Sequence, residues 1–121
     1  MQKAVPVHEL SIVETLIEQV ESEVRRSGHD GDIVGLDLAI GRLSGINVDS
    51  IRFAFELLSP DTLLRRADLR IIEPKAACRC EQCGARTEID DLVAECPACG
   101  GRRITFEGGQ ELSLESIELE D

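Results

Sequence analysis

Five cysteines between residues 78 and 99 are the residues of this chain best suited to chemistry. Four of them form two C-x-x-C pairs, Cys80-Glu81-Gln82-Cys83 and Cys96-Pro97-Ala98-Cys99, separated by twelve residues. Two such pairs supply the four thiolates that close a tetrahedral zinc site. Glycine follows each pair, at positions 84 and 100, where a positive φ lets the turn wrap and direct N–H groups at the sulfurs. The spacing predicts one structural Zn²⁺ on Cys80, Cys83, Cys96 and Cys99.

Other uses of these thiols stay open at this point. An iron–sulfur cluster, a rubredoxin-like iron or a redox-active dithiol pair employs the same residue types. Four thiolates leave no open coordination position for water, which disfavours Lewis-acid catalysis at the ion. The fifth thiol, Cys78, is interpreted as a spare cysteine on a strand entering the metal site, with ligand exchange against Cys80 as the alternative.

The composition argues against binding to nucleic acid or membranes. The net charge is -11, and 0 Trp, 0 Tyr and 3 Phe leave almost no surface for base stacking. No apolar run approaches the roughly 20 residues that span a bilayer, and the first residues lack the apolar core of a signal peptide. We therefore expect a cytoplasmic protein whose thiols are reduced, which favours a metal over disulfides.

Apolar periodicity predicts two helices that each bury one face. The first runs from His8 to about Ser27 and ends at Gly28, and the second starts after the capping residue Asn47 and ends before Pro60. The helical stripes consist of Leu10, Val13, Leu16, Ile17, Val20 and Val24 in the first, and Ile51, Ala54, Phe55 and Leu58 in the second.

Three strands are expected around the helices, over 34–40, 69–73 and about 111–119. In the last strand, Leu112 and Leu114 have the opposite parity to Ile117 and Leu119. Either a bulge near Glu115-Ser116 or burial on both faces explains this pattern. The predicted fold is α+β, a small antiparallel or mixed three-stranded sheet with two helices, carrying an inserted four-cysteine zinc ribbon. Its expected domains are 1–75 plus 107–121, and the ribbon 76–106.

Several segments outside the cysteines share their order and spacing with one known family. They are Val7-His8-Glu9-Leu10-Ser11, the turn from Ile40 to Gly45, and the helix segment from Ile51 to Glu56. Together with the two cysteine pairs and their glycines, the chain resembles the HypA/HybF family of hydrogenase nickel-insertion proteins over about residues 7–119. The joint match is specific, although no single segment other than the cysteines is decisive.

The resemblance implies a nickel-binding metallochaperone that delivers Ni²⁺ during maturation of [NiFe]-hydrogenase, or of urease in some organisms. Nickel is then a transient cargo bound at His8 and Glu9, while zinc is structural. The implied partners are a hydrogenase-maturation GTPase and the hydrogenase large-subunit precursor. The client enzyme, the oligomeric state (a homodimer included) and any coupling between the zinc and nickel sites stay open.

The nickel chemistry suits these residues, with one departure from the family pattern. Ni²⁺ accepts a square plane of nitrogen donors, for which a terminal amine, backbone amides and one imidazole suffice. Glu9 either orients the imidazole or ligates the metal itself. In the family the histidine follows the initiator methionine, whereas Val7 holds that place here. Either translation starts at Val7 through a GTG codon, or six preceding residues are real and the nickel site uses another donor in place of the amine.

No nucleophile–base pair or phosphate-binding loop is present in the sequence, so we expect no enzymatic turnover. His29 is interpreted as an exposed loop histidine. The alternative function is a zinc-ribbon module that regulates by binding nucleic acid, favoured locally by Arg79, Arg86, Arg102 and Arg103. Against it stands the acidic charge of the chain as a whole.

Overall fold

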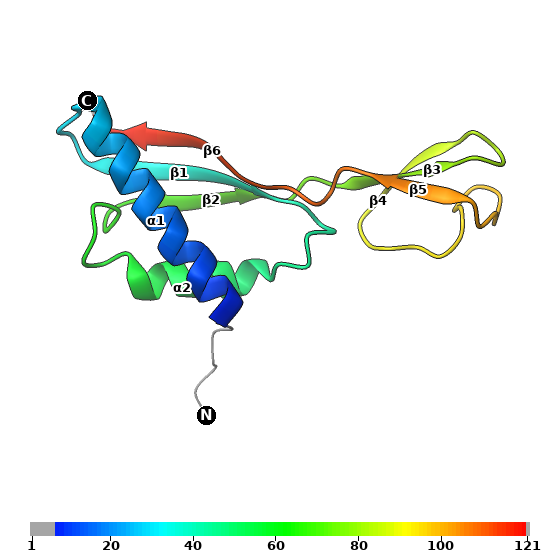
Figure 1. Cartoon of the computed structure of the whole chain (residues 1–121), viewed down its shortest axis with the longest axis horizontal. Coiled ribbons are helices and arrows are strands. Elements are labelled where there is room, and N and C mark those ends of the chain that lie inside the picture. Colours follow the sequence, from blue (N-terminus) through cyan, green and yellow to red (C-terminus); the bar gives the residue numbers. More distant parts are fainter. Residues whose placement is uncertain (1–6, 121) are drawn as a thin grey trace. The chain divides into compact units, whose positions relative to one another are not determined.

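The structure is a computed structural model that describes residues 7–120. Within these residues, two helices and six strands follow one another (Figure 1). They are α1 (Val7–Ser27), β1 (Ile33–Ile40), α2 (Val48–Leu58), β2 (Asp68–Ile72), β3 (Ala76–Cys80), β4 (Arg86–Ile89), β5 (Ile104–Glu107) and β6 (Leu112–Leu119). The strands form two three-stranded sheets, and the chain divides into two compact units.

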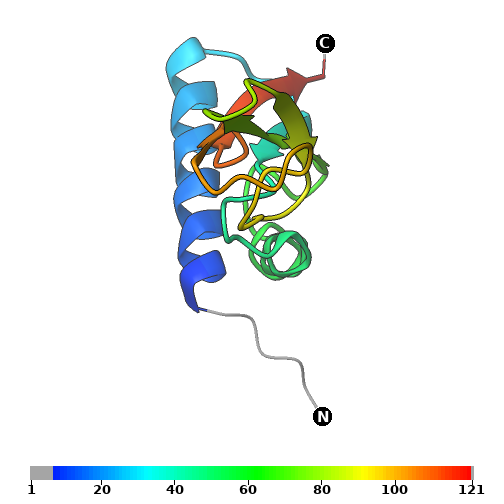
Figure 2. The ribbon, with the colours of Figure 1, turned by 90° about the vertical axis from the view of Figure 1, so that its right-hand side faces the viewer.

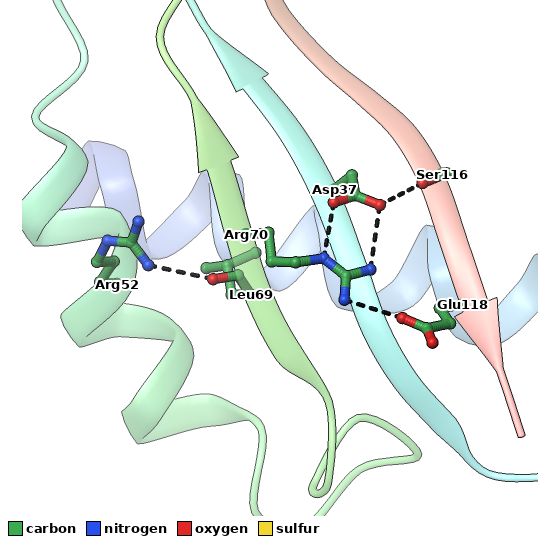
Figure 3. A network of polar contacts seen from close by, with 6 residues as sticks. All are labelled: Asp37, Arg52, Leu69, Arg70, Ser116 and Glu118. Carbon is green, nitrogen blue, oxygen red and sulfur yellow. Dashed lines mark hydrogen bonds and ion pairs between the residues drawn. The ribbon is translucent and has the colours of Figure 1, made fainter.

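The first unit comprises Met1–Leu38, Ile46–Ile71 and Leu114–Asp121. Its sheet has the order β2-β1-β6, with β2 parallel and β6 antiparallel to the central strand (Figure 3). Adjacent parallel strands need a crossover, and α2 supplies it between β1 and β2. Figure 2 shows α1 from the side and α2 nearly end-on, so the two helices cross. This mixed sheet with two helices confirms the predicted fold class.

The core of the first unit consists of the predicted helical stripes and the inward side chains of the central strand. Leu36 and Leu38 of β1 are buried, whereas Asp37 between them lies on the opposite, solvent-facing side of the sheet. The buried helix residues are Val13, Leu16, Ile17, Val20 and Val24 of α1, and Ile51, Ala54 and Phe55 of α2. Their spacing of three and four residues keeps each set on one helical face.

Both predicted helix boundaries are confirmed by their capping interactions. Gly28 has φ 73°, and its N–H donates to the carbonyl of Arg25, as expected of a residue directly after a helix. The Asn47 side chain accepts a hydrogen bond from the N–H of Ser50 at 2.9 Å, which satisfies one of the open donors of α2.

The last strand, β6, exposes one row of polar side chains. Ser116 and Glu118 lie on the open face of the sheet, while Leu114, Ile117 and Leu119 are half-buried. The half-buried positions therefore change from even to odd residue numbers between Leu114 and Ile117, as the apolar residues do in the sequence. The exposure of Ser116 and Glu118 argues against a strand covered on both faces, and the bulge stays a prediction.

The second unit comprises Ala39–Gly45 and Ile72–Ser113. Its sheet has the order β4-β3-β5, and both pairings are antiparallel. A small apolar core lies against the sheet, formed by the buried side chains Ala76, Cys78 and Ile89 with the half-buried Leu43, Val93 and Ile104. A unit with so few buried apolar side chains depends on additional stabilisation, of the kind that a metal ion provides.

The turn that follows β1 belongs to this second unit. The N–H of Gly41 donates to the Glu111 carbonyl at 2.8 Å, and the N–H of Arg42 donates to the Pro74 carbonyl at 3.0 Å. Leu43 adds its side chain to the small core. The division expected from the sequence places these residues in segment 1–75, and that division stays a prediction.

Among the described residues, none of the helices has the length and apolar character required to cross a membrane.

Candidate metal centre

The two C-x-x-C segments fold into matching turns. Cys80 is the last residue of β3, and its N–H donates to the carbonyl of Ala85, while the N–H of Cys96 donates in the same way to Gly101. Gly84 and Gly100 have φ 76° and 77°, and their N–H groups donate to the carbonyls of Cys80 and Cys96. The positive φ predicted for both glycines is therefore confirmed.

The turns bring four sulfur atoms together. All four lie within 4.8 Å of one another, and the Sγ atoms of Cys80 and Cys99, and of Cys83 and Cys96, are 3.7 Å apart. A tetrahedral ion with Zn–S bonds of about 2.3 Å requires sulfurs about 3.8 Å apart. The donor set and its spacing thus fit a four-thiolate metal ion, and no other group of three or more His, Cys, Asp or Glu donors occurs within residues 7–120.

Backbone N–H groups point at the sulfurs and favour their ionised form. Cys80 Sγ accepts from the N–H of Cys83 at 3.4 Å and of Gln82 at 3.3 Å. These bonds, that of Cys83 first, lower the pKa of Cys80 to about 7 against the opposing effect of burial. In Cys96, N–H groups of Cys99 and Ala98 lower the pKa in the same way.

The raised pKa of Cys99 indicates that the four thiolates are stable together only with a cation. The N–H of Gly101 acts to lower the pKa of Cys99, but the adjacent thiols of Cys83 and Cys80 outweigh it and raise this pKa to about 12. Four thiolates so close together repel one another. A divalent cation offsets that repulsion, and its binding releases protons.

Cys78 stands apart from the four ligands. It is only 1% exposed, lies in the small core beside Ala76 and Ile89, and is paired across the sheet with Thr87 and Phe106. Burial is the main cause that raises the pKa of its thiol. This position agrees with the interpretation of a structural cysteine on the strand that leads to the metal site.

His8 and Glu9 lie in the first turn of α1 and have opposite environments. His8 is exposed, whereas Glu9 is 5% exposed, and its Oε2 accepts a hydrogen bond from the N–H of Asn47 at 3.3 Å. The carboxylate therefore holds the residue that caps α2. The amine of Met1 and the rest of the segment 1–6 lie outside the described residues.

His29 lies in the loop after α1, as expected, but it is half-buried rather than exposed. Its Nε2 lies 3.0 Å from the backbone oxygen of Glu120, so the ring ties this loop to the residue after β6. That contact partly covers the ring, and it joins residues too far apart in the chain for a local pattern to reveal. His29 belongs to none of the groups of metal donors within the described residues.

A charged network on the open face of the first sheet was not anticipated from the sequence (Figure 3). Arg70 of β2 donates to both carboxylate oxygens of Asp37, at 2.8 and 3.1 Å, and to Glu118 of β6 at 2.8 Å. Ser116 donates to Asp37 as well. Hydrogen bonds from Arg70 and then Ser116 lower the pKa of Asp37, and those to Asp37 and Glu118 raise the pKa of Arg70. Beside the network, Arg52 of α2 donates to a backbone carbonyl of β2.

This network joins all three strands of the sheet. Gly35 makes room for it, because a Cβ at that position would lie 2.6 Å from Nη2 of Arg70. The sequence offered one indication of this network, because Gly35 and Asp37 alternate with the apolar residues of β1. Both carboxylates bind the Arg70 guanidinium, and within the described residues neither belongs to a group of metal donors.

Taken together, an α+β unit and a three-stranded unit with a four-cysteine metal centre define a small metal-binding protein. A family model described as hydrogenase/urease nickel incorporation, metallochaperone, HypA, matches residues 7–119. The chain therefore belongs to the HypA family of nickel metallochaperones, which act in hydrogenase maturation. Membership of this family does not favour the alternative function, a zinc-ribbon module that binds nucleic acid.

Individual relatives extend over almost the entire chain. The hydrogenase maturation factor HypA of Chlorobaculum tepidum is 40% identical over 114 residues, which is 94% of this chain and 100% of the relative. That of Rhodobacter capsulatus is 33% identical over 113 residues, 93% of this chain and 99% of the relative. The solution structure of the nickel metallochaperone HypA from Helicobacter pylori is 25% identical with a TM-score of 0.61, covering 92% of this chain and 96% of that one.

Proposed function

We propose that this protein carries Ni²⁺ at the first turn of α1, with the His8 imidazole as a ligand, and holds a structural Zn²⁺ on Cys80, Cys83, Cys96 and Cys99. The observation that carries the nickel proposal is the contrast between His8 and Glu9. The imidazole faces solvent, where an ion can enter and leave, while the adjacent carboxylate is buried and bonded to Asn47. An anchored backbone with an exposed donor suits a cargo ion that must be transferred.

In this proposal Glu9 supports the site by fixing the first turn of α1. Its carboxylate accepts from the backbone N–H of Asn47, so the position of the His8 backbone depends on a contact with the start of α2. Of the two roles expected for Glu9, ligand or orienting group, the burial of the side chain favours the second. The remaining nickel donors then come from backbone amides together with either the terminal amine of a chain that starts at position 7 or another donor in its place.

Zinc is the ion that best suits the four-cysteine centre. A closed tetrahedron of thiolates is the usual structural zinc site, and the metal contributes folding free energy to a unit with a small core. The protein has no turnover of its own in this proposal. It passes nickel, in the cytoplasm, to a maturation GTPase and from there to the hydrogenase large-subunit precursor, or to the corresponding urease components.

Nickel titration by calorimetry tests the nickel site. We expect His8→Ala to abolish the tightest Ni²⁺ binding and His29→Ala, which removes the other histidine of the chain, to leave it unchanged. The same titration is made on the full chain and on a chain that starts at position 7 as methionine. Stronger binding by the shorter chain supports amine ligation, whereas equal binding by all variants contradicts the assignment of His8.

Metal analysis tests the zinc site separately. We expect one zinc and no iron per chain in the purified protein, and thiolate-to-metal absorption of a tetrahedral site after replacement by Co²⁺. A protein that lacks zinc and catalyses disulfide reduction would instead support the dithiol alternative.

A further inference from the structure

The two cysteine turns have the same backbone but differ in the protection of their sulfurs. The first cysteine of each turn, Cys80 or Cys96, is buried at 2% or 3% exposure, and the second, Cys83 or Cys99, is exposed. Access to the metal centre from solvent is therefore through Cys83 and Cys99.

Cys99 is exposed, but groups from both turns lie near its sulfur. It accepts a hydrogen bond from the N–H of Gly101 at 3.4 Å. The Gln82 side chain reaches across from the other turn and lies over Gly101, so that a Cβ at Gly101 would be 2.8 Å from Cδ of Gln82 and 3.2 Å from Sγ of Cys99. The missing Cβ at Gly101 thus provides the space in which the Gln82 amide lies beside the Cys99 sulfur.

Cys83 has neither form of cover. The residue that corresponds to Gln82 in the second turn is Ala98, whose single methyl group cannot reach across. The residue that corresponds to Gly101 is Ala85, and within residues 7–120 no N–H donates to Cys83 Sγ, whose polar contact is with the sulfur of Cys96 at 3.7 Å. The asymmetry follows from two sequence differences at matching positions.

Cover and hydrogen bonding both reduce the reactivity of a metal-bound thiolate. An N–H donor stabilises the negative charge on sulfur and so lowers the drive to form a new bond, and a side chain over the sulfur restricts approach. Of the four ligands, Cys83 combines exposure with the lack of an N–H donor. Cys83 is therefore the exposed sulfur whose negative charge is least stabilised by hydrogen bonds.

We propose that Cys83 is the modification site of this metal centre, at which soft electrophiles and two-electron oxidants such as hydrogen peroxide react first and cause the ion to leave. In the oxidation, the thiolate of Cys83 attacks one peroxide oxygen, the O–O bond breaks and hydroxide departs. The sulfur is oxidised by two electrons to a sulfenic acid, and the peroxide is reduced. The metal thereby loses one thiolate ligand. This inference rests on the proposed zinc occupancy of the four cysteines.

The test uses the zinc-loaded full chain and substoichiometric N-ethylmaleimide, whose ring carbon forms a bond to sulfur while the adjacent carbon takes a proton from water. Peptide mass spectrometry locates the label, and a chromogenic chelator follows zinc release. We expect Cys83 to be labelled about fivefold or more ahead of Cys99, the ratio that one lost N–H bond provides. Zinc release should follow the Cys83 label, and buried Cys78 serves as the internal unlabelled control.

Two variants exchange the cover between the turns. Ala98→Gln combined with Ala85→Gly adds the longer side chain and removes the Cβ that would occupy its place, and we expect this double variant to slow labelling of Cys83 and zinc release. Gln82→Ala uncovers Cys99, and we expect its labelling to rise toward that of Cys83. Hydrogen peroxide with a sulfenic-acid trap should reproduce the same order of sites.

The outcomes separate this inference from the proposed function. A protein with one zinc per chain whose Cys83 and Cys99 label equally, or Cys99 first, overturns the inference and leaves the zinc site intact. A purified protein without zinc overturns the proposed zinc site itself, and with it the inference. Neither result bears on nickel binding at His8, which calorimetry measures independently.

Discussion

Replacing Glu9 by alanine should release the amide of Asn47 and loosen the joined starts of α1 and α2. Glu9 is 5% exposed, and its Oε2 accepts the Asn47 N–H at 3.3 Å. The alanine variant leaves that donor without its partner, whereas Glu9→Gln keeps an oxygen acceptor of nearly the same shape. Glu9→Gln therefore changes mainly the charge of the acceptor, whereas Glu9→Ala removes both the acceptor and the packing of a buried side chain.

The expected magnitude follows from this one contact. A hydrogen bond to a charged acceptor contributes about 1.5–3 kcal/mol, and a carboxylate in the first turn of a helix adds about 0.3–1 kcal/mol through the helix dipole. We expect Glu9→Ala to destabilise the first unit by about 2–4 kcal/mol, and Glu9→Gln by about 1 kcal/mol. The difference of about 1–3 kcal/mol corresponds to a change of roughly five- to 150-fold in local opening.

Native-state hydrogen exchange of the Asn47 amide measures the opening directly. Its protection should fall strongly in Glu9→Ala and only slightly in Glu9→Gln. Glu14→Gln, which neutralises an exposed glutamate of the same helix, is the control and should change it little. If Glu9→Ala leaves Asn47 protection unchanged, the proposed anchoring role is refuted.

Nickel titration of the same variants separates anchoring from ligation. If Glu9 acts through the fold, Glu9→Gln should keep nickel affinity close to that of the unchanged chain. A loss of tenfold or more in Glu9→Gln, with Asn47 still protected, would show instead that the carboxylate ligates the ion.

The cap of α2, the small core of the second unit and the Arg70 network lead to three more expected outcomes. Asn47→Ala should cost about 1 kcal/mol by removing the cap of α2, with Asn47→Asp as the control that keeps an acceptor, both measured from exchange of the Ser50 amide. A strong chelator should abolish amide protection in β3, β4 and β5 but preserve it in α1 and β1, because only the second unit has so small a core; equal loss in both units would contradict this dependence. By carbon NMR, Asp37 should titrate below the usual carboxyl pKa of about 3.9 and return toward it in Arg70→Ala; because this pKa is depressed, its contribution to stability is present above pH about 3.9 and is lost as the pH falls through the folded value.

Local features of this protein could be predicted from the sequence because the interacting residues are close in the chain. The glycine after each C-x-x-C pair has the predicted positive φ, and Asn47 caps α2 as its position before an apolar stripe indicates. The apolar stripes of both helices are buried largely as their periodicity predicts. In each case the backbone geometry of one turn decides the outcome.

Contacts between residues far apart in the chain could not be predicted in the same way. The tie between Glu9 and Asn47 spans 38 residues. The helical period places Glu9 on the buried face, four residues before Val13, but nothing in the local pattern indicates Asn47 as its partner. The same holds for Arg70, which joins strands from three parts of the sequence. Such contacts depend on which strand lies beside which, and on the face that each side chain takes.

The four cysteines of the metal centre show most clearly which features the sequence predicts and which depend on the tertiary structure. The sequence by itself predicted the four cysteines that the fold brings together and the form of their turns, since these depend on residue type and short spacing. Only the tertiary structure decided that Cys80 and Cys96 are buried and that the turn after β1 belongs to the metal-binding unit. It also decided that the Gln82 side chain lies at Gly101, next to the turn of Cys99. The physical reason is that exposure and cover arise where two turns meet, and that meeting is set by the fold.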